Sequence, residues 1–294
     1  MAMIDLSIAV AYAVLMLLLF ATGATFGSLL GALIERFPRG MSLWRPRSFC
    51  MQCNTQLAWY DLIPLLSFLL LQGRCRHCHT KIQPKLLLLE LLCGLLLCLL
   101  AARWGNSICT LQLFCLCWLL LAIAYLDAQT GWMPLNLLIL LLLSGWGFAA
   151  LSDMGFDKSS CVLSVNLLQR FAASTAAFAA LGAVLLMSTK ILQYRKRLQP
   201  QQTAMGWGDP LLLAGIAAYV GFLWLPMILF LASLQSVVVH LFYRITQKPW
   251  IPQKWHAESD DNQLAEQAIP FGPFLAAATW QTVAIALLWP TLLL

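Results

Sequence analysis

Long apolar stretches alternate with shorter polar segments along almost the whole chain. Eight stretches stand out, at residues 8–31, 84–102, 108–126, 133–151, 170–190, 210–224, 225–243 and 270–293. A helix of about 20 apolar residues crosses the ~30 Å hydrocarbon core of a bilayer. The pattern therefore predicts an all-α polytopic membrane protein with about eight transmembrane helices. The least distinct spans are the short one starting at Pro210 and its neighbour, which begins near Leu225-Pro226.

The composition agrees with a membrane protein. Of the 294 residues, 61% are hydrophobic and 10% are charged, whereas about 25% of residues are charged in a typical soluble domain. A soluble globular protein is therefore excluded, and the lipid bilayer is an expected partner. The first basic residue is Arg36. Because no basic segment precedes the first apolar stretch, we expect it to be retained as a span rather than cleaved as a signal peptide.

The basic residues predict the orientation of the spans. If the N-terminus lies outside, the inside loops are 32–83, 127–132, 191–209 and 244–269. Of the 18 Lys and Arg, all but three fall in these loops or at their edges, as the positive-inside rule requires. The exceptions are Arg103, Lys158 and Arg170. The net charge of +6 therefore reflects membrane topology, and we expect no nucleic acid as a partner.

The same pattern divides the chain into three parts. We predict a first transmembrane helix over 1–31, an inside loop subdomain over 32–83 and the remaining transmembrane domain over 84–294. The loop subdomain is too small for a self-sufficient hydrophobic core, so a metal site would help it to fold. The inside loop 244–269 is polar and lacks periodicity, which is typical of a flexible linker.

Four cysteines of the loop subdomain have the spacing of a metal site. The pairs Cys50-x-x-Cys53 and Cys75-x-x-Cys78 can present four thiolates in a tetrahedron, as in structural zinc sites. A reducing cytosol favours metal ligation over disulfides, so we predict a structural Zn²⁺. Free thiols or a redox pair are the alternatives, and His77 and His79 could compete as ligands. The other cysteines lie in or beside apolar runs and are interpreted as small packing residues: Cys93, Cys98, Cys109, Cys115, Cys117 and Cys161.

Two aspartates at the ends of apolar stretches are candidates for chemistry. Asp127 and Asp209 fall on the same side of the membrane in the predicted topology. An ionisable residue at bilayer depth costs roughly 2.5–3.5 kcal/mol, so it tends to be retained for function. A pair of carboxylates that shares a proton can hydrolyse a peptide bond, and Gly206 and Gly208 would allow close backbone approach.

The aspartates also have other interpretations. Asp209, before Pro210, could be a simple helix N-cap, and the segment from Asp127 to Pro134 could be a polar turn. A proton-coupled transporter could use the same acids, although the spans carry few polar residues. A third possibility is a non-catalytic assembly scaffold.

Several segments, in order along the chain, together resemble the type IV prepilin peptidases. They are Gly27-Ser28, Arg36-Phe37-Pro38, the two cysteine pairs flanking Trp59–Ser67, Ile82–Glu90, Asp127 with Pro134, Gly206-x-Gly208-Asp209, and Ile269–Phe274. The resemblance implies that Asp127 and Asp209 are the catalytic pair of a Gly-x-Gly-Asp intramembrane aspartic endopeptidase. The sequence departs from the family pattern at Leu211, two residues after Asp209, where family members usually have a lysine. Without the positive charge of that lysine, the electrostatics around Asp209 must differ.

The resemblance also implies substrates and a location. Such enzymes cleave the basic leader from prepilins or type II secretion pseudopilins, after a glycine, at the cytoplasmic face of the bacterial inner membrane. Many then methylate the new N-terminus with S-adenosylmethionine. The active site and the large loop would face the cytoplasm. Three acids are candidates for contact with the basic leader: Glu35, Asp61 and Glu90.

Overall fold

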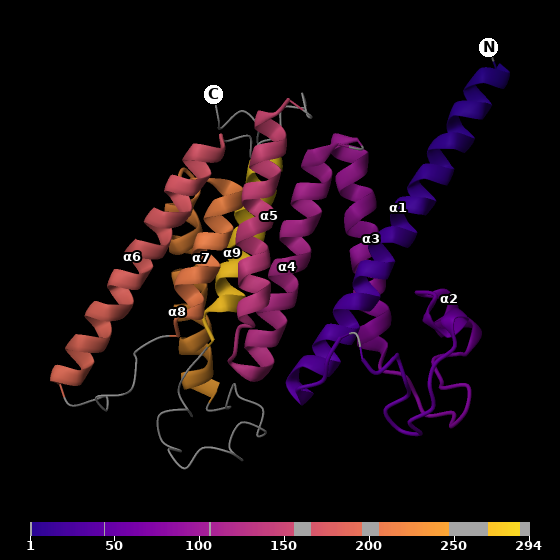
Figure 1. Ribbon diagram of the computed structural model, residues 1–294, viewed down its shortest axis with the longest axis horizontal. Helices are drawn as coiled ribbons and strands as arrows, with labels where there is room; N and C mark the ends of the chain where they lie inside the picture. The colour runs from indigo at the N-terminus through magenta and orange to yellow at the C-terminus, as the bar shows by residue number, and fades with distance from the viewer. Residues whose placement is uncertain are drawn as a thin grey trace. The chain divides into compact units, whose positions relative to one another are not determined.

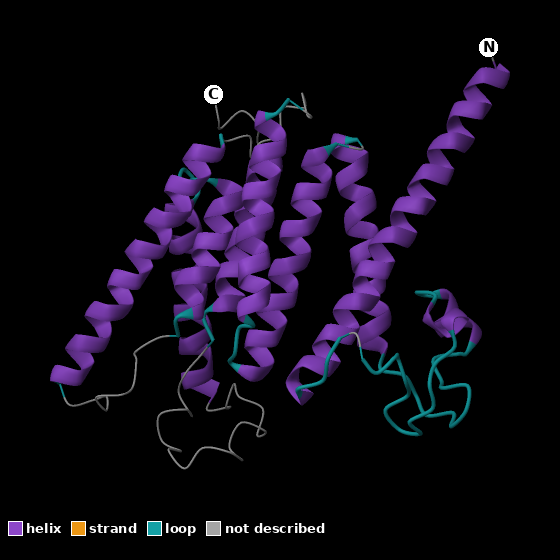
Figure 2. Cartoon of the chain, viewed as in Figure 1, coloured by secondary structure: helices purple, strands orange, loops and turns teal. Residues whose placement is uncertain are grey.

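The computed structural model describes residues 2–43, 45–105, 107–155, 166–195, 206–246 and 270–288. This part of the chain is helical and contains no β-strand, only two isolated bridges (Figures 1 and 2). Its α-helices are α1 (Ala2–Arg36), α2 (Leu66–Leu70), α3 (Pro84–Trp104), α4 (Ile108–Thr130), α5 (Leu135–Asp153), α6 (Leu167–Tyr194), α7 (Gly208–Val220), α8 (Leu225–Thr246) and α9 (Gly272–Leu288).

The predicted spans are confirmed as helices. Each of the eight apolar stretches coincides with one helix, and only the short α2 in the loop was not foreseen. Among the described helices, six are long and apolar enough to cross a membrane: α1, α3, α4, α5, α6 and α8. Helix α7 has 13 residues, or about 20 Å at 1.5 Å per residue, and is shorter than the hydrocarbon core. Most of the predicted linker 244–269 lies outside the described residues.

The chain forms two compact units, residues 1–114 and 115–294. In the first, α1 packs along α3 through glycines one turn apart on one face of α1. A Cβ added to Gly23 would lie 2.5 Å from the Cys93 carbonyl oxygen, and one added to Gly27 would lie 2.5 Å from Glu90 Cα. Gly31 faces Leu86 in the same way. This close backbone contact is the small-residue packing used between membrane helices.

Side-chain hydrogen bonds fasten the loop subdomain to these two helices. The guanidinium of Arg36, buried at the end of α1, donates to the carbonyls of Ser42, Leu43 and Pro46 at 3.1, 2.8 and 3.1 Å. The carboxylate of Glu90, on α3, accepts the backbone N–H of Leu65 at 2.8 Å. The beginning and the middle of the loop are thereby held by the helices that flank it in sequence.

The second unit surrounds α7, which contacts α5, α6 and α9 and is buried from Leu212 to Val220. Arg170, the first residue of the predicted span 170–190, lies within α6 and is fully buried. It donates to the carbonyls of Gly145 and Ala218 at 3.3 and 3.2 Å. A cation near the C-terminal end of α7 is favourable for the helix dipole, so Arg170 anchors the end of α7 opposite Asp209.

One prediction about the cysteines is wrong. Cys109, at the start of α4, was expected to be a packing residue but is disulfide-bonded. Position in an apolar run reveals nothing about a covalent partner distant in sequence. Cys93, Cys98, Cys115 and Cys117 are free thiols as expected, and Cys161 lies outside the described residues.

The α1–α3 contact leads to a stability prediction. In Gly27→Ala, the new methyl group meets the α3 backbone, so the helices must separate at a cost of about 1–3 kcal/mol. The measurement is thermal unfolding of the purified protein in detergent. The matched control is Gly147→Ala, because no atom lies within 4 Å of a Cβ at that exposed helical position. Equal stability of the two variants would contradict the packing account.

Candidate functional site

Asp127 lies in the last turn of α4, within the helix rather than in the polar turn considered above. Its side chain is buried, with 3% exposure. Its Oδ2 accepts the backbone N–H of Gly272 at 3.1 Å, and Gly272 is the first residue of α9. The hydrogen bond therefore brings the start of α9 to the end of α4, although the two lie far apart in sequence.

Asp209 lies in the first turn of α7 and is 7% exposed. The N-cap residue of α7 is Trp207, two positions before Asp209, so the interpretation of Asp209 as an N-cap is wrong. Its buried Oδ1 has no hydrogen-bond partner within the part of the chain that the structure describes. A buried carboxylate oxygen without a partner costs free energy, unless the site serves a ligand.

The two carboxylates are near neighbours, close enough for their charges to interact. Met133 and two glycines pack tightly around them. A Cβ on Gly272 would lie 2.6 Å from both Asp127 Oδ2 and Met133 Cε, and one on Gly208 would lie 3.1 Å from Met133 Sδ. The close approach predicted for Gly208 is thus observed, whereas a Cβ on Gly206 would make only an ordinary contact, 3.9 Å from the backbone nitrogen of Gly208.

The site is therefore built from three helix ends. The C-terminal end of α4 supplies Asp127, the N-terminal end of α7 supplies Asp209, and the N-terminal end of α9 supplies the N–H of Gly272. Helix N-termini carry partial positive charge that stabilises anions. Sequence reasoning missed the roles of Met133 and Gly272, since both depend on contacts between distant segments. A buried acid pair at helix ends can bind a water and a carbonyl group and can transfer protons between them.

The four predicted cysteines form a separate cluster in the first unit. The ligand atoms of Cys50, Cys53, Cys75 and Cys78 all lie within 4.8 Å of one another, so the cluster could hold a zinc ion. Tetrahedral Zn–S bonds near 2.3 Å place sulfur atoms about 3.8 Å apart. The Cys50 and Cys78 sulfurs are 3.7 Å apart, which fits that geometry.

The cluster consists of two matching turns. The Cys50 N–H donates to the Thr55 carbonyl at 3.0 Å, and the Cys75 N–H donates to the Thr80 carbonyl at 2.9 Å. Asn54 and His79 occupy equivalent left-handed positions, with φ of 56° and 55°. His79 therefore shapes its turn, and neither it nor His77 belongs to the metal-ligand group.

Local hydrogen bonding also favours metal binding. The Thr80 hydroxyl, hydrogen-bonded to the Cys78 sulfur over 3.3 Å, lowers the pKa of the Cys78 thiol to about 6. The thiolate is the form that ligates metals.

Two of the three acids proposed to contact a basic leader already have partners. Asp61 pairs with Arg76 at 2.7 Å, and Glu90 accepts the Leu65 N–H. Within the described residues, the carboxylate of Glu35 has no hydrogen-bond or ion-pair partner; its backbone carbonyl accepts a hydrogen bond from the Arg39 guanidinium at 3.2 Å. Among the three, Glu35 is therefore the acid with a side chain available to a ligand.

Two family models match the chain. "Bacterial Peptidase A24 N-terminal domain" matches residues 21–104, which include the four clustered cysteines. "Type IV leader peptidase family" matches residues 114–241, which include both buried aspartates.

Curated relatives agree with these matches. The chain is 33% identical to the prepilin leader peptidase/N-methyltransferase of Burkholderia pseudomallei over 83% of this chain and 68% of the relative. It is 35% identical to the protein of that name from Klebsiella pneumoniae, over 73% of this chain and 89% of the relative. The relative of that name from Myxococcus xanthus is 32% identical, over 94% of this chain and 75% of the relative. No solved structure shows significant similarity.

The geometry of the cluster predicts one zinc ion per chain. Elemental analysis of the purified protein should find it, and the double variant Cys75→Ser, Cys78→Ser should lose it, because two ligands cannot hold a structural zinc site. Cys98→Ala is the matched control, since Cys98 is a free cysteine of α3 outside the cluster. Unmutated protein without metal would refute the prediction.

Proposed function

The chain belongs to the type IV leader peptidase family, and from that membership we propose that it is an intramembrane aspartic endopeptidase. Its substrates are prepilins or type II secretion pseudopilins, from which it removes the leader peptide. The observation that carries the proposal is the pairing of Asp127 and Asp209 in a buried site at three helix ends. Neither a transporter nor an assembly scaffold requires this arrangement of acids.

The contacts support different roles for the two aspartates. The N–H of Gly272 stabilises the charged form of Asp127, so Asp127 is the ionised member that takes a proton from the attacking water. Asp209 is the protonated member, and its unpartnered oxygen is available to the scissile carbonyl. Two carboxylates whose charges interact in a buried site do not both ionise, so the pair holds one proton between them.

The reaction then proceeds in two steps, each with two proton transfers. Asp127 removes a proton from water, the hydroxide oxygen bonds to the carbonyl carbon, and Asp209 donates its proton to the developing oxyanion. When the tetrahedral intermediate collapses, the C–N bond breaks. Asp127 gives its proton to the leaving amine, and Asp209 recovers its own from one hydroxyl of the intermediate as the carbonyl reforms, which leaves a carboxylic acid. Both aspartates return to their starting states.

The departure at Leu211 is compatible with this chemistry. The usual lysine would place a cation near Asp209, whereas here positive potential comes from backbone. The N-terminal ends of α7 and α9 both face the acid pair, and helix N-termini favour negative charge by about 0.3–1 kcal/mol or more when partly buried.

The disulfide supports the orientation of the site toward the cytoplasm. Cys109 and Asp127 lie at opposite ends of α4, about 27 Å apart along the helix axis. Disulfides persist in oxidising compartments, so the disulfide-bonded Cys109 favours the outer side and Asp127 the reducing inner side. By connectivity, the loop between α1 and α3, with its four thiols, is then also cytoplasmic. This matches the basic residues of the inside loops and a place in the bacterial inner membrane.

A second activity follows from the relatives' names, which include N-methyltransferase. We propose that the chain also methylates the new N-terminus of the processed substrate, with S-adenosylmethionine as methyl donor. If so, purified protein should transfer labelled methyl groups from S-adenosylmethionine to the processed substrate but not to the intact substrate.

The aspartate pair yields the main functional prediction. In Asp127→Asn or Asp209→Asn, leader cleavage of a prepilin by purified protein should fall by about 10²–10⁴-fold or more, since proton transfer in the transition state is lost. Cleavage is measured by gel shift and by the mass of the new N-terminus. Asp153→Asn is the matched control, because Asp153 ends α5 and accepts the Leu167 N–H away from the pair. Near-normal cleavage by either pair variant would refute the assignment.

A second prediction concerns the backbone donor. Gly272→Ala places a methyl group against Asp127 and Met133, and displacement of a catalytic group by about 1 Å can cost on the order of 10²-fold in rate. We expect kcat/KM for cleavage to fall by roughly that factor while membrane insertion is retained. Gly147→Ala should be active. Full activity of Gly272→Ala would show that the Gly272 contact does not position Asp127.

A further inference from the structure

Apolar side chains gather on the outer surface of the loop subdomain. They lie on the 3-10 helix η2 (Trp59–Leu62), on α2 and on the residues that join them. Trp59, Leu69 and Leu70 are 72%, 68% and 74% exposed. The others in this set, which we call the loop apolar patch, are Tyr60, Leu62, Ile63 and Leu66. A contiguous exposed apolar patch of this kind marks a surface that is covered by something other than water.

Hydrogen bonding fixes the depth of this patch relative to α1 and α3. Leu65, just before α2, donates to Glu90 at 2.8 Å, and Ser28 of α1 also hydrogen-bonds Glu90. Glu90 lies about 9 Å along α3 from its first residue, Pro84, and Ser28 lies about 12 Å from the end of α1 at Arg36. Helix α2 is therefore beside the lengths of α1 and α3 and not beyond their ends, as Figure 1 shows for α3.

That depth lies among the upper acyl chains, just inside the boundary between lipid headgroups and acyl chains. Helix α3 has 21 residues, or about 31 Å, close to the ~30 Å thickness of the hydrocarbon core. A point about 9 Å inside its end lies below the headgroups. Trp59 and Tyr60 have the side chains that are enriched at this boundary, with an apolar ring and a polar group.

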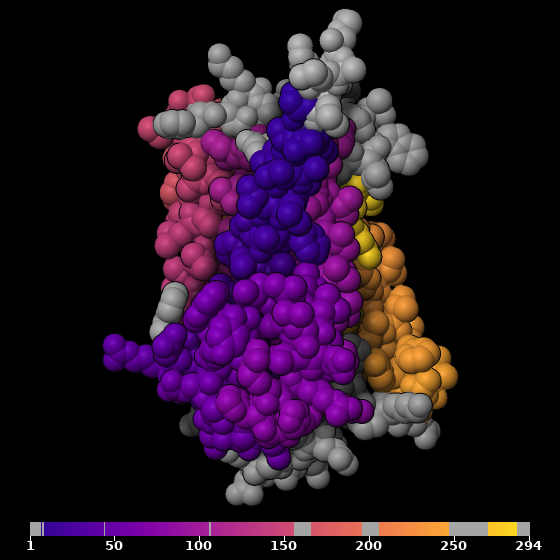
Figure 3. All heavy atoms as spheres, turned by 90° about the vertical axis from the view of Figure 1, so that its right-hand side faces the viewer, coloured from indigo at the N-terminus to yellow at the C-terminus, as the bar shows by residue number. Residues whose placement is uncertain are grey.

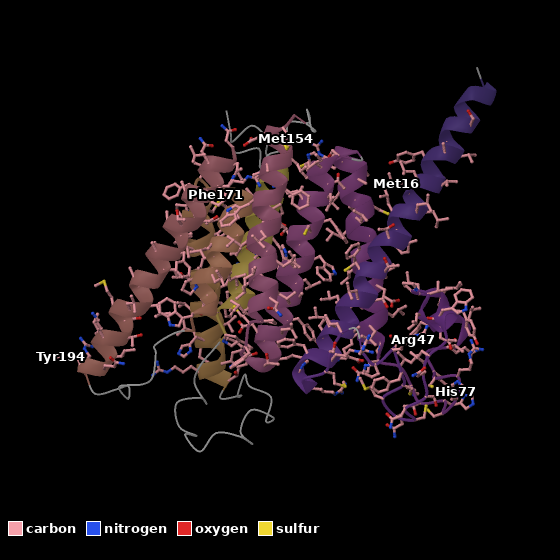
Figure 4. All side chains as sticks on the ribbon, in the orientation of Figure 1. Met16, Arg47, His77, Met154, Phe171 and Tyr194 are labelled. Atoms are coloured by element: carbon pink, nitrogen blue, oxygen red, sulfur yellow. The ribbon has the colours of Figure 1, made fainter. Side chains whose placement is uncertain are left out.

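Charges next to the patch match a membrane surface. Arg76 pairs with Asp61 at 2.7 Å and lies over the Tyr60 ring, 5.1 Å from its centroid. The loop carries three further polar or basic residues, Arg47, Arg74 and His77. Figure 4 shows Arg47 and His77 on the loop. Figure 3 shows the loop as a broad outer face of the molecule. Basic residues at a membrane surface attract anionic lipids by about 1 kcal/mol each.

We propose that Trp59–Leu70 is an interfacial membrane element that inserts into the leaflet on the side where the loop emerges. Its apolar side chains enter the region of the upper acyl chains, and Arg74 and Arg76 contact anionic phospholipid headgroups. The lipid contact and the Leu65–Glu90 hydrogen bond together hold the four-cysteine cluster at the membrane surface. The occupant of the patch is lipid, and neither a second copy of the chain nor a substrate helix is needed to cover it.

Photo-crosslinking of the full chain tests the proposal. The photoreactive amino acid p-benzoylphenylalanine replaces Trp59 or Leu70, one per variant, in protein reconstituted into nanodiscs of phosphatidylethanolamine and phosphatidylglycerol. After illumination, intact-mass spectrometry should show protein heavier by one phospholipid in both variants. The control carries the same residue at Gln52, an exposed polar position in the first cysteine turn, where lipid adducts should be several-fold fewer.

The outcomes separate the possible occupants. Zinc content reports whether the loop is folded, so only variants with the zinc content of the unmutated protein are compared. The replacement at Trp59 also keeps an aromatic group at that site. Lipid adducts at Trp59 and Leu70 above the Gln52 level support the proposal. Covalent dimers in place of lipid adducts, or adducts no more frequent than at Gln52, overturn it.

Discussion

The burial of two carboxylates among apolar helices is the constraint on which the second unit depends. Asp127 and Asp209 are almost fully buried, and a buried charge is tolerated only where the surroundings supply hydrogen bonds or opposite potential. Both come from backbone: the Gly272 N–H and the N-terminal ends of α7 and α9. Helix α7 stops short of a full span, and Arg170 binds the carbonyl of Ala218 at its far end. Helix α7 is thus fixed at both ends, and Asp209 lies at the end that forms the site.

The cysteine loop meets a different constraint by a different means. It has too little apolar interior to fold on its own, and its large apolar residues on η2 and α2 point outward. Four thiols at metal-ligand distances and the contacts of Arg36 and Glu90 hold it instead. The glycines of α1 contribute indirectly, because they bring α1 close enough to α3 for Ser28 and Leu65 to reach the same carboxylate.

Properties that depend on neighbouring residues could be predicted from the sequence. Each span was found because hydrophobicity is local, and the cysteine cluster because its spacing is itself the signal. The acid pair was found from position at the ends of apolar runs. Contacts between distant segments were missed: the Gly272 donor, Met133, the disulfide at Cys109 and the burial of Arg170. The packing of Gly23, Gly27 and Gly31 against α3 was not predicted either, although their spacing places all three on one helix face.

The central claim is that Asp127 and Asp209 act together on a water and a peptide carbonyl. The most direct measurement is the affinity of a prepilin-like peptide in which a hydroxyethylene group replaces the scissile amide, compared with the uncleaved amide peptide in Asp127→Asn protein. Because the hydroxyl resembles the tetrahedral transition state, it should bind the unmutated protein at least about 10²-fold more tightly than the amide. It should lose that advantage in the variant. Equal affinity for the two peptides in the unmutated protein would contradict the account.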